Sequence, residues 1–263
     1  MDALGFLLSD EFLGAVMPVI VYWVYSGFYI VLEPYCHNYR LHSKQDEDQK
    51  NLVSKSTAVK GVLLQHFLQA TVALFIFVVT GPSETEPSTK ESSSFMVIVK
   101  QIIIAMLVMD TYQYFVHRLL HHNKFLYRRL HSIHHRLVVP YGFGANYSDP
   151  FEAFLFDTVS GALSFLISGM SARTSIYFYS LATIKSVDDH CGLVIPGNPF
   201  HILFRNNTAY HDLHHQLHGG KYNFSHPFFI MWDKIMGTHM PFTLVKRVEG
   251  GFEAILAKDV KEK

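Results

Sequence analysis

The chain has 263 residues, enough for one sizeable domain, and a formal net charge of zero. Hydrophobic residues make up 49% of it and charged residues only 17%, against about 25% in a typical soluble domain. The balanced charge argues against a nucleic acid partner. The two cysteines, Cys36 and Cys191, are far apart, which argues against a disulfide framework or a cysteine-based zinc site. Histidine is the outlier, with 17 residues.

Long apolar stretches predict membrane-spanning helices, because about 20 helical residues cross the roughly 30 Å hydrocarbon core of a bilayer. Four stretches qualify: residues 13–32, 61–81, 95–116 and 151–170. A fifth, 174–187, is shorter and contains Lys185, so it either completes a hairpin with the fourth stretch or lies re-entrant. The first stretch lacks the basic leading segment of a signal peptide, which favours a retained anchor.

The distribution of lysine and arginine predicts the orientation of these helices. The loop between the first two stretches holds five basic residues, whereas loop 82–94 holds only Lys90. Cytosolic loops are the basic ones, so the first loop is expected in the cytosol. The third stretch then returns to the cytosol, where five more basic residues follow it: Arg118, Lys124, Arg128, Arg129 and Arg136. Everything after residue 190 is expected on the same side.

We therefore predict an all-α, integral-membrane helical bundle of about four spans with a histidine-rich helical cap on its cytosolic side. Residues 1–94 are interpreted as an N-terminal transmembrane anchor region. Residues 95–245 are interpreted as the catalytic region, which forms one structural domain with the anchor. Residues 246–263 are interpreted as a charged C-terminal tail.

Three histidine clusters carry the candidate chemistry. They are His117 with His121, then His131, His134 and His135, then His211, His214 and His215. Positions i, i+3 and i+4 of a helix share a face, so each cluster is expected to point two or three imidazoles the same way. A chain of this composition contains His-x-x-His-His by chance only about 0.07 times. Because the predicted topology brings all three clusters to the cytosolic face, we expect them to converge.

The number of histidines favours two metal ions over one. His190, in Asp-Asp-His at the cytosolic end of the predicted hairpin, is a ninth candidate ligand. Eight or nine imidazoles exceed the four ligands of a zinc ion and suit two ions with four or five ligands each. Imidazole binds iron, zinc, copper and nickel. His218, His201 and His239 are weaker candidates, and the remaining histidines are interpreted as structural or solvated.

Carboxylates could hold these imidazoles in place by hydrogen bonds. Asp110 lies seven residues before His117 and so shares its helix face, although a polar residue near the membrane interface explains it equally well. Asp188, Asp189 and Asp212 are weaker candidates for the same role.

The order of these clusters resembles the three histidine boxes of the fatty acid hydroxylase superfamily of membrane di-iron enzymes. The stretches 189–192 and 232–238 resemble that family's extra histidine segment and its Trp-Asp…Gly-Thr element. Within the superfamily the chain is most similar to the plant sphingoid-base C4-hydroxylases, through residues 10–14, 22–27, 39–44 and 187–199. One departure is Asp149-Pro150, where many members carry His-Pro.

This resemblance implies an O2-dependent di-iron monooxygenase of the endoplasmic reticulum membrane, with its active site facing the cytosol. The implied reaction is C4-hydroxylation of sphinganine or dihydroceramide to phytosphingosine, with the nine histidines holding two iron ions. It further implies electrons from NADH or NADPH through a separate cytochrome b5 and its reductase. Arg128, Arg129 and Arg136 could dock that donor, although they equally explain the positive-inside signal. An oligomer is possible.

Two alternatives stay open at this point. A C4-methyl sterol oxidase of the same superfamily shares the boxes and differs in its pocket. A histidine-rich membrane metal transporter is the rival from another class, but transporters place ionisable groups near mid-membrane, whereas these clusters lie at span ends. Three sequons, at Asn146, Asn206 and Asn223, fall on the predicted cytosolic side, so we expect none to be glycosylated.

Overall fold

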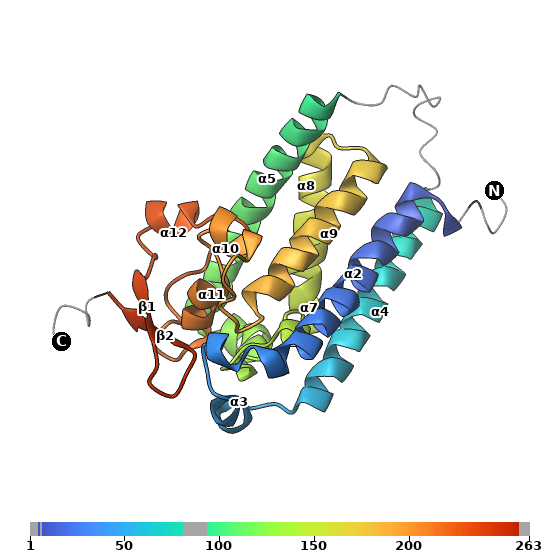
Figure 1. Cartoon of the computed structure of the whole chain (residues 1–263). Coiled ribbons are helices and arrows are strands. Elements are labelled where there is room, and N and C mark those ends of the chain that lie inside the picture. Colours follow the sequence, from blue (N-terminus) through green and yellow to red (C-terminus); the bar gives the residue numbers. More distant parts are fainter. Residues whose placement is uncertain (1–4, 6, 81–93, 258–263) are drawn as a thin grey trace.

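The structure is a computed structural model that describes residues 5, 7–80 and 94–257. Long helices run side by side as a bundle, and a compact cap closes one end of it (Figure 1). The bundle contains α2 (Asp10–Leu32), α4 (Lys55–Thr80), α5 (Phe95–His122), α9 (Ala172–Asp189) and a continuous helical segment of three parts. These parts are α7 (Pro150–Ala153), the π-helical η6 (Phe154–Val159) and α8 (Ser160–Ser168).

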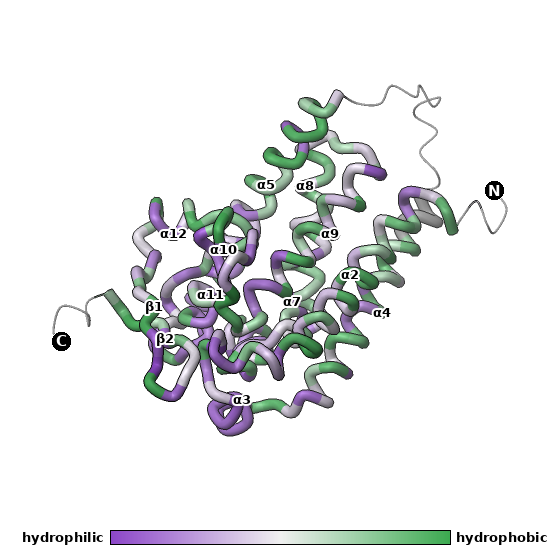
Figure 2. Tube along the Cα trace, viewed as in Figure 1, coloured by the Kyte–Doolittle hydropathy of each residue, from purple (hydrophilic) through white to green (hydrophobic). Residues whose placement is uncertain are grey.

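Four of these helices are long and apolar enough to cross a membrane, as predicted. They are Asp10–Tyr35, Lys55–Phe75, Phe95–His122 and Pro150–Ser168. Their outward faces carry exposed apolar side chains such as Val31, 70% exposed, and Leu166, 72% exposed, and Figure 2 shows apolar residues along the bundle helices. Such faces suit lipid and would be unusual in water. The predicted helical membrane bundle is therefore confirmed.

The fifth stretch forms α9, which completes the hairpin and returns along α2 to the cap (Figure 1). Gly169, with φ +63°, ends α8 in the left-handed conformation that glycine adopts most readily. Ser171 then caps α9 by accepting a hydrogen bond from the Thr174 backbone N–H at 3.1 Å. This tight connection brings residue 190 to the same end of the bundle as the other clusters.

The cap is built from short elements. They are η1 (Glu33–Tyr35), η2 (His37–Tyr39), α3 (Lys44–Lys50), α6 (Lys124–Leu126), η3 (Tyr127–His131), η4 (His134–Arg136), η5 (Gly142–Gly144), α10 (Pro199–Leu203), α11 (Thr208–His215) and α12 (Met231–Ile235). A two-stranded antiparallel sheet, β1 (Phe242–Lys246) and β2 (Phe252–Leu256), was not predicted. The all-α description therefore needs this correction: β2 lies where only a charged tail was expected. Residues 82–93 of the predicted loop and 258–263 of that tail lie outside the described residues.

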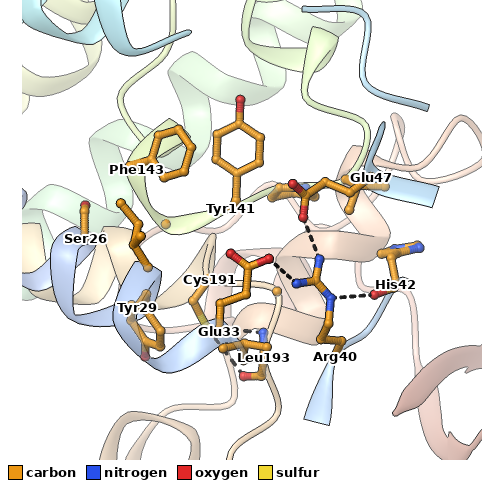
Figure 3. A pocket seen from close by; sticks show the side chains of 15 residues that line it. Ser26, Tyr29, Glu33, Arg40, His42, Glu47, Tyr141, Phe143, Cys191 and Leu193 are labelled. Atoms are coloured by element: carbon orange, nitrogen blue, oxygen red, sulfur yellow. Dashed lines mark hydrogen bonds and ion pairs between the residues drawn. The ribbon is translucent and has the colours of Figure 1, made fainter. Parts of the chain in front are cut away.

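A partly buried ion-pair cluster connects the end of α2 to the cap (Figure 3). The Arg40 guanidinium pairs with Glu33 and, at 2.5 Å, with Glu47 of α3. The neighbouring backbone of Leu41 donates to Gly192 at 2.9 Å, just after residue 190. The space beside Arg40 is only about 20 Å³, room for roughly one water molecule. The Arg40 cluster therefore helps to hold the loop that carries His190 in place.

Candidate metal centre

The structure brings the nine candidate histidines together in two adjoining groups. The first group contains His117, His121, His131, His135 and His214, and the second contains His134, His190, His211 and His215. Within each group one ring nitrogen from every residue lies within 4.8 Å of the others. The groups adjoin, since the rings of His135 and His215 are 4.7 Å apart between centroids. Groups of five and four match the ligand numbers expected for two ions.

Two histidines of each sequence cluster lie in the same group, as predicted, but the third member of each larger cluster does not. Histidines four residues apart stay together, as His131 and His135 do in the first group and His211 and His215 in the second. The i+3 members cross over, so His134 joins the second group and His214 joins the first. Positions i and i+4 differ by about 40° around a helix and i and i+3 by about 60° to the other side. Each box with three histidines therefore serves both groups.

Irregular helices aim these rings. His117 and His121 occupy the last turns of α5, whereas His131 ends the π-helical η3 and His134 begins the 3-10 turn η4. A π turn and a 3-10 turn in succession rotate the chain away from regular α-helical spacing. The box on the regular helix α11 divides its histidines in the same way, so these irregular turns aim the rings of the second box but are not the cause of the division.

Backbone carbonyls fix the orientation of most of the nine rings. His117 Nδ1 donates to the carbonyl of Phe224 at 2.9 Å, and His134 Nδ1 donates to that of Tyr147 at 3.0 Å. Three more rings donate in the same way: His190 to Ser186, His214 to Tyr222 and His215 to Leu137. A neutral imidazole has one N–H, so Nε2 of each of these rings carries a lone pair.

The lone pairs face each other inside the groups. His117 Nε2 lies 3.0 Å from His131 Nε2, and His134 Nε2 lies 3.4 Å from His190 Nε2. All four of these rings use Nδ1 as the donor, so no proton is left between the paired nitrogens. Two nitrogen ligands about 2.1 Å from a metal ion and 90° apart lie about 3 Å from each other. The donor set therefore fits metal ions bound in both groups.

Burial keeps the imidazoles outside the membrane spans neutral. It lowers the pKa of His134 to about 4 and the pKa of His190 and His214 to about 3. It also holds the pKa values of His131, His135, His211 and His215 well below the usual range. Neutral imidazole is the form that binds a metal ion, so these groups can take up metal without first losing a proton.

The carboxylate that orients a candidate ligand is Glu152, which sequence reasoning missed. His131 Nδ1 donates to Glu152 Oε1 at 2.5 Å, and the glutamate is only 4% exposed. Glu152 lies in the fourth apolar stretch, 21 residues from His131. Its charge within that stretch was the only sequence signal that could have singled it out.

The four predicted carboxylates have other partners. Asp110 accepts hydrogen bonds from the backbone N–H groups of Phe228, at 3.0 Å, and Phe229, at 2.6 Å. Among the described residues, Asp188 contacts Tyr29, Tyr25, Asn198 and His201, Asp189 pairs with Lys185, and Asp212 pairs with His42. None of these contacts reaches a ring of the two groups. The helix-face argument for Asp110 was therefore wrong, because its partners come from a distant segment.

Asp233 holds the segments that orient and carry two of the candidate ligands. It accepts hydrogen bonds from the Phe224 backbone at 3.0 Å, from the Ser225 backbone at 2.6 Å, and from the hydroxyl of Tyr210. Phe224 supplies the carbonyl that orients His117, and Tyr210 immediately precedes His211. The Trp-Asp…Gly-Thr element therefore positions parts of both groups.

The weaker histidine candidates lie outside both groups. His218 is exposed, His201 contacts Asp188 at 3.1 Å, and His239 packs against the ring of Tyr210. His226, which was interpreted as structural or solvated, is buried, and its ring lies 4.7 Å from that of His211. A single histidine without a spaced partner gave no sequence signal of this position.

A long cavity inside the bundle opens onto the two groups. It has a volume of about 480 Å³, and α2, α4, α5, α8 and α9 all contribute to its walls. Five candidate ligands reach it: His117, His131, His134, His190 and His211. Lining residues extend along α9 from Ala172 to His190, which at 1.5 Å per residue is about 27 Å. Small and apolar side chains, including Ala15, Ala73 and Phe165, line the part away from the histidines.

The comparisons with known proteins agree with this architecture. The chain matches the fatty acid hydroxylase family model over residues 102–238. It is 60% identical over 259 residues to sphinganine C4-monooxygenase 1 of Arabidopsis thaliana, covering 98% of this chain and 99% of the relative. It is 53% identical over 254 residues to very-long-chain aldehyde decarbonylase GL1-9 of Oryza sativa subsp. indica, covering 96% and 97%.

More distant relatives follow. Sphingolipid C4-hydroxylase sur2 of Schizosaccharomyces pombe is 38% identical over 255 residues, covering 86% of this chain and 87% of the relative. Methylsterol monooxygenase 1 of Gallus gallus is 26% identical over 226 residues, covering 85% and 73%. No solved structure matches. The family match includes all three histidine boxes and His190, and the chain therefore belongs to the fatty acid hydroxylase family.

Proposed function

We propose that this chain is an O2-dependent di-iron monooxygenase that hydroxylates C4 of sphinganine to give phytosphingosine. The observation that carries the proposal is the opening of both histidine groups onto one long, largely apolar cavity inside a membrane bundle. A lipid chain in that cavity meets the candidate metal centre directly. The 60% identity to a sphinganine C4-monooxygenase over almost the whole chain supports the same substrate.

The nine histidines would hold the two ions, five around one and four around the other. Iron bound there would activate O2 and oxidise an unactivated C–H bond. The chain's own residues hold the ligand rings in their metal-binding tautomer through Nδ1. Phe156 and Phe224 pack against the ring of His117, each with centroids 5.7 Å away, and keep bulk water from it. The cavity walls position the substrate chain.

The relatives favour C4-hydroxylation over the other activities. Identity to the Arabidopsis C4-monooxygenase, 60%, exceeds identity to the rice aldehyde decarbonylase, 53%. The methylsterol monooxygenase is far more distant, at 26%. A transporter is disfavoured because both histidine groups lie together at one end of the bundle.

We propose the endoplasmic reticulum membrane as the location, with the centre on the cytosolic side. Exposed Arg128, Arg129 and Arg136 lie on the segment that carries His131, His134 and His135. They could dock cytochrome b5, which would supply electrons from NADH or NADPH through its reductase.

The function is tested in a host that lacks its own sphingoid-base C4-hydroxylase. We expect the intact chain to restore trihydroxy sphingoid bases and His131→Ala to restore none. The matched control is His218→Ala, which removes an exposed histidine outside both groups and should restore trihydroxy bases fully. Alkanes in place of trihydroxy bases, or oxidised 4-methylsterols, would support a rival activity.

Metal analysis of the purified full-length protein tests the cofactor separately. We expect about two iron ions per chain, and fewer in His131→Ala. A single labile zinc ion with no oxygen consumption would contradict the oxygenase.

A further inference from the structure

Two carboxylates of one helical segment line the cavity beside the histidine groups. They are Glu152 of α7 and Asp157 of η6. Glu152 uses Oε1 to bind His131, while its Oε2 is buried without a hydrogen-bond partner. Asp157 accepts a hydrogen bond from Gln65 Nε2 at 3.2 Å. Within the described part of the chain, neither carboxylate forms an ion pair with a lysine or arginine.

Asp157 lies in the π-helical η6 (Phe154–Val159), and Glu152 lies just before it in α7; both side chains line the same cavity. π-Helical segments are frequent at functional sites. Phe156, next to Asp157, packs against the ring of His117. Asp157 therefore lies beside the part of the cavity that the first histidine group reaches.

The charged side chains on the described cavity wall are all acidic. Four carboxylates line it, those of Asp10, Glu11, Glu152 and Asp157, and its described lining contains no lysine or arginine. A fatty acid carboxylate would be repelled by such a wall and a cation would be attracted. Asp10 and Glu11 lie at the start of α2, about 25 Å from the histidines at 1.5 Å per residue, and Asp10 pairs with Arg173. In the metal-free protein, two of the four carboxylates, Glu152 and Asp157, therefore lie at the histidine end, where metal ions bound by the histidines would add positive charge.

The covalent geometry of a sphingoid base places its cation at that end. Its amino nitrogen is on C2, so only three bonds separate the nitrogen from C4. Two atoms three bonds apart in an extended chain lie about 3.8 Å from each other, like consecutive Cα atoms. An ammonium group must therefore bind close to the carbon that is oxidised.

We propose that Asp157 binds the ammonium group of the free sphingoid base, and so selects the free base over N-acylated forms and uncharged chains. This inference rests on the proposed C4-hydroxylation and names the substrate form for that site. The unpartnered Oε2 of Glu152 offers a second acceptor for the three N–H groups. Gln65 and Ser148, joined by a hydrogen bond of 3.2 Å, offer partners for the hydroxyl groups. An amide nitrogen in an N-acylated base carries no charge and only one N–H, so it cannot form the ion pair with Asp157.

Binding to the metal-free, full-length protein in lipid nanodiscs tests the inference without turnover. Trp23 Nε1 donates to Nδ1 of His66, which lines the cavity, so tryptophan fluorescence reports ligand entry. The probes are sphinganine and N-acetylsphinganine. We expect Asp157→Asn to weaken sphinganine binding at least about 30-fold and N-acetylsphinganine binding less than about 3-fold.

Two further variants separate a binding role from a structural one. Asp157→Glu keeps the charge and should recover part of the sphinganine affinity. Asp48→Asn removes a carboxylate that is 64% exposed outside the cavity and should leave both affinities unchanged. Equal loss of both ligands in Asp157→Asn, or no loss of either, would overturn the inference. If the affinities change as expected but no trihydroxy base forms, the proposed reaction fails and the ammonium site stands.

Discussion

Glu152→Gln is predicted to weaken one of the two metal sites and leave the other intact. The carboxylate holds His131 Nδ1–H at 2.5 Å in a site where Glu152 is 4% exposed. Glutamine keeps the shape but loses the charge. If its amide N–H₂ faces the ring, the proton of His131 moves to Nε2 and blocks the lone pair that faces the first group.

The expected magnitude follows from such supporting contacts. Removing a group that orients a ligand histidine costs about 10- to 100-fold in metal affinity, or about 1.4 to 2.7 kcal/mol. Among the described residues, Glu152 forms its hydrogen bond with His131 of the first group, so the second group should keep its affinity.

The assay is titration of metal-free protein with Co²⁺ against a competing chelator, followed by visible absorption. Wild type should take up two ions, and Glu152→Gln should show one of them weakened by that factor. Asp149→Asn is the matched control, because it lies three residues away and caps α7 through the Phe151 N–H at 2.9 Å. Two undisturbed Co²⁺ affinities in Glu152→Gln would refute the reasoning.

Three further predictions concern stability, each measured by thermal or denaturant unfolding of the purified protein. Gly219→Ala should lower the free energy of unfolding by about 2 kcal/mol or more, because its Cβ would lie 1.6 Å from a carbonyl oxygen of α11. Gly220→Ala, whose nearest new contact is 3.9 Å, should change the free energy of unfolding by no more than about 0.5 kcal/mol. Equal effects of the two substitutions would contradict the packing. Burial would raise the pKa of Glu47, but hydrogen bonds from its lysine partners hold that pKa at about 2, below the usual 4.5. The ionised carboxylate therefore stabilises the fold above pH 4.5, and this stabilisation is lost as the pH falls toward 2. Between pH 4.5 and pH 2 the wild type should therefore lose about 3 kcal/mol more of its free energy of unfolding than Glu47→Gln. The same pH dependence in both proteins would contradict this role of Glu47. Lys185→Met leaves the fully buried Asp189 carboxylate unpaired and should cost about 3 to 5 kcal/mol, much of it recovered when Asp189→Leu is added; no recovery would contradict a buried ion pair.

The spans and the candidate ligands were predictable because both depend on local patterns. A membrane helix requires a run of apolar residues, which the sequence shows directly. The hairpin of α8 and α9 then had to return residue 190 to the end of the bundle where the other clusters lie. Convergence of the nine rings followed from counting crossings, without any knowledge of side-chain contacts.

The partners of those ligands were not predictable, because they depend on contacts between distant segments. Asp110 shares a helix face with His117, yet it binds backbone groups more than 100 residues away. Glu152 binds His131 across 21 residues that contain only the short 3-10 turns η4 and η5, which no periodicity indicates. The strands β1 and β2 were missed because a five-residue strand beside a charged tail leaves only a weak alternating pattern.

The division of the two larger histidine boxes between the two groups could nevertheless be predicted from the sequence. A box of His-x-x-His-His joins an i, i+4 pair to an i+3 member about 100° away from its last residue. Three rings spread over that arc cannot all reach one ion at about 2.1 Å, but they can bridge two neighbouring ions. The His117 and His121 box lacks an i+3 member and contributes to one group only. The spacing within the boxes therefore separates the i+3 histidines, His134 and His214, from their box partners, which is the division between the two groups that the structure shows.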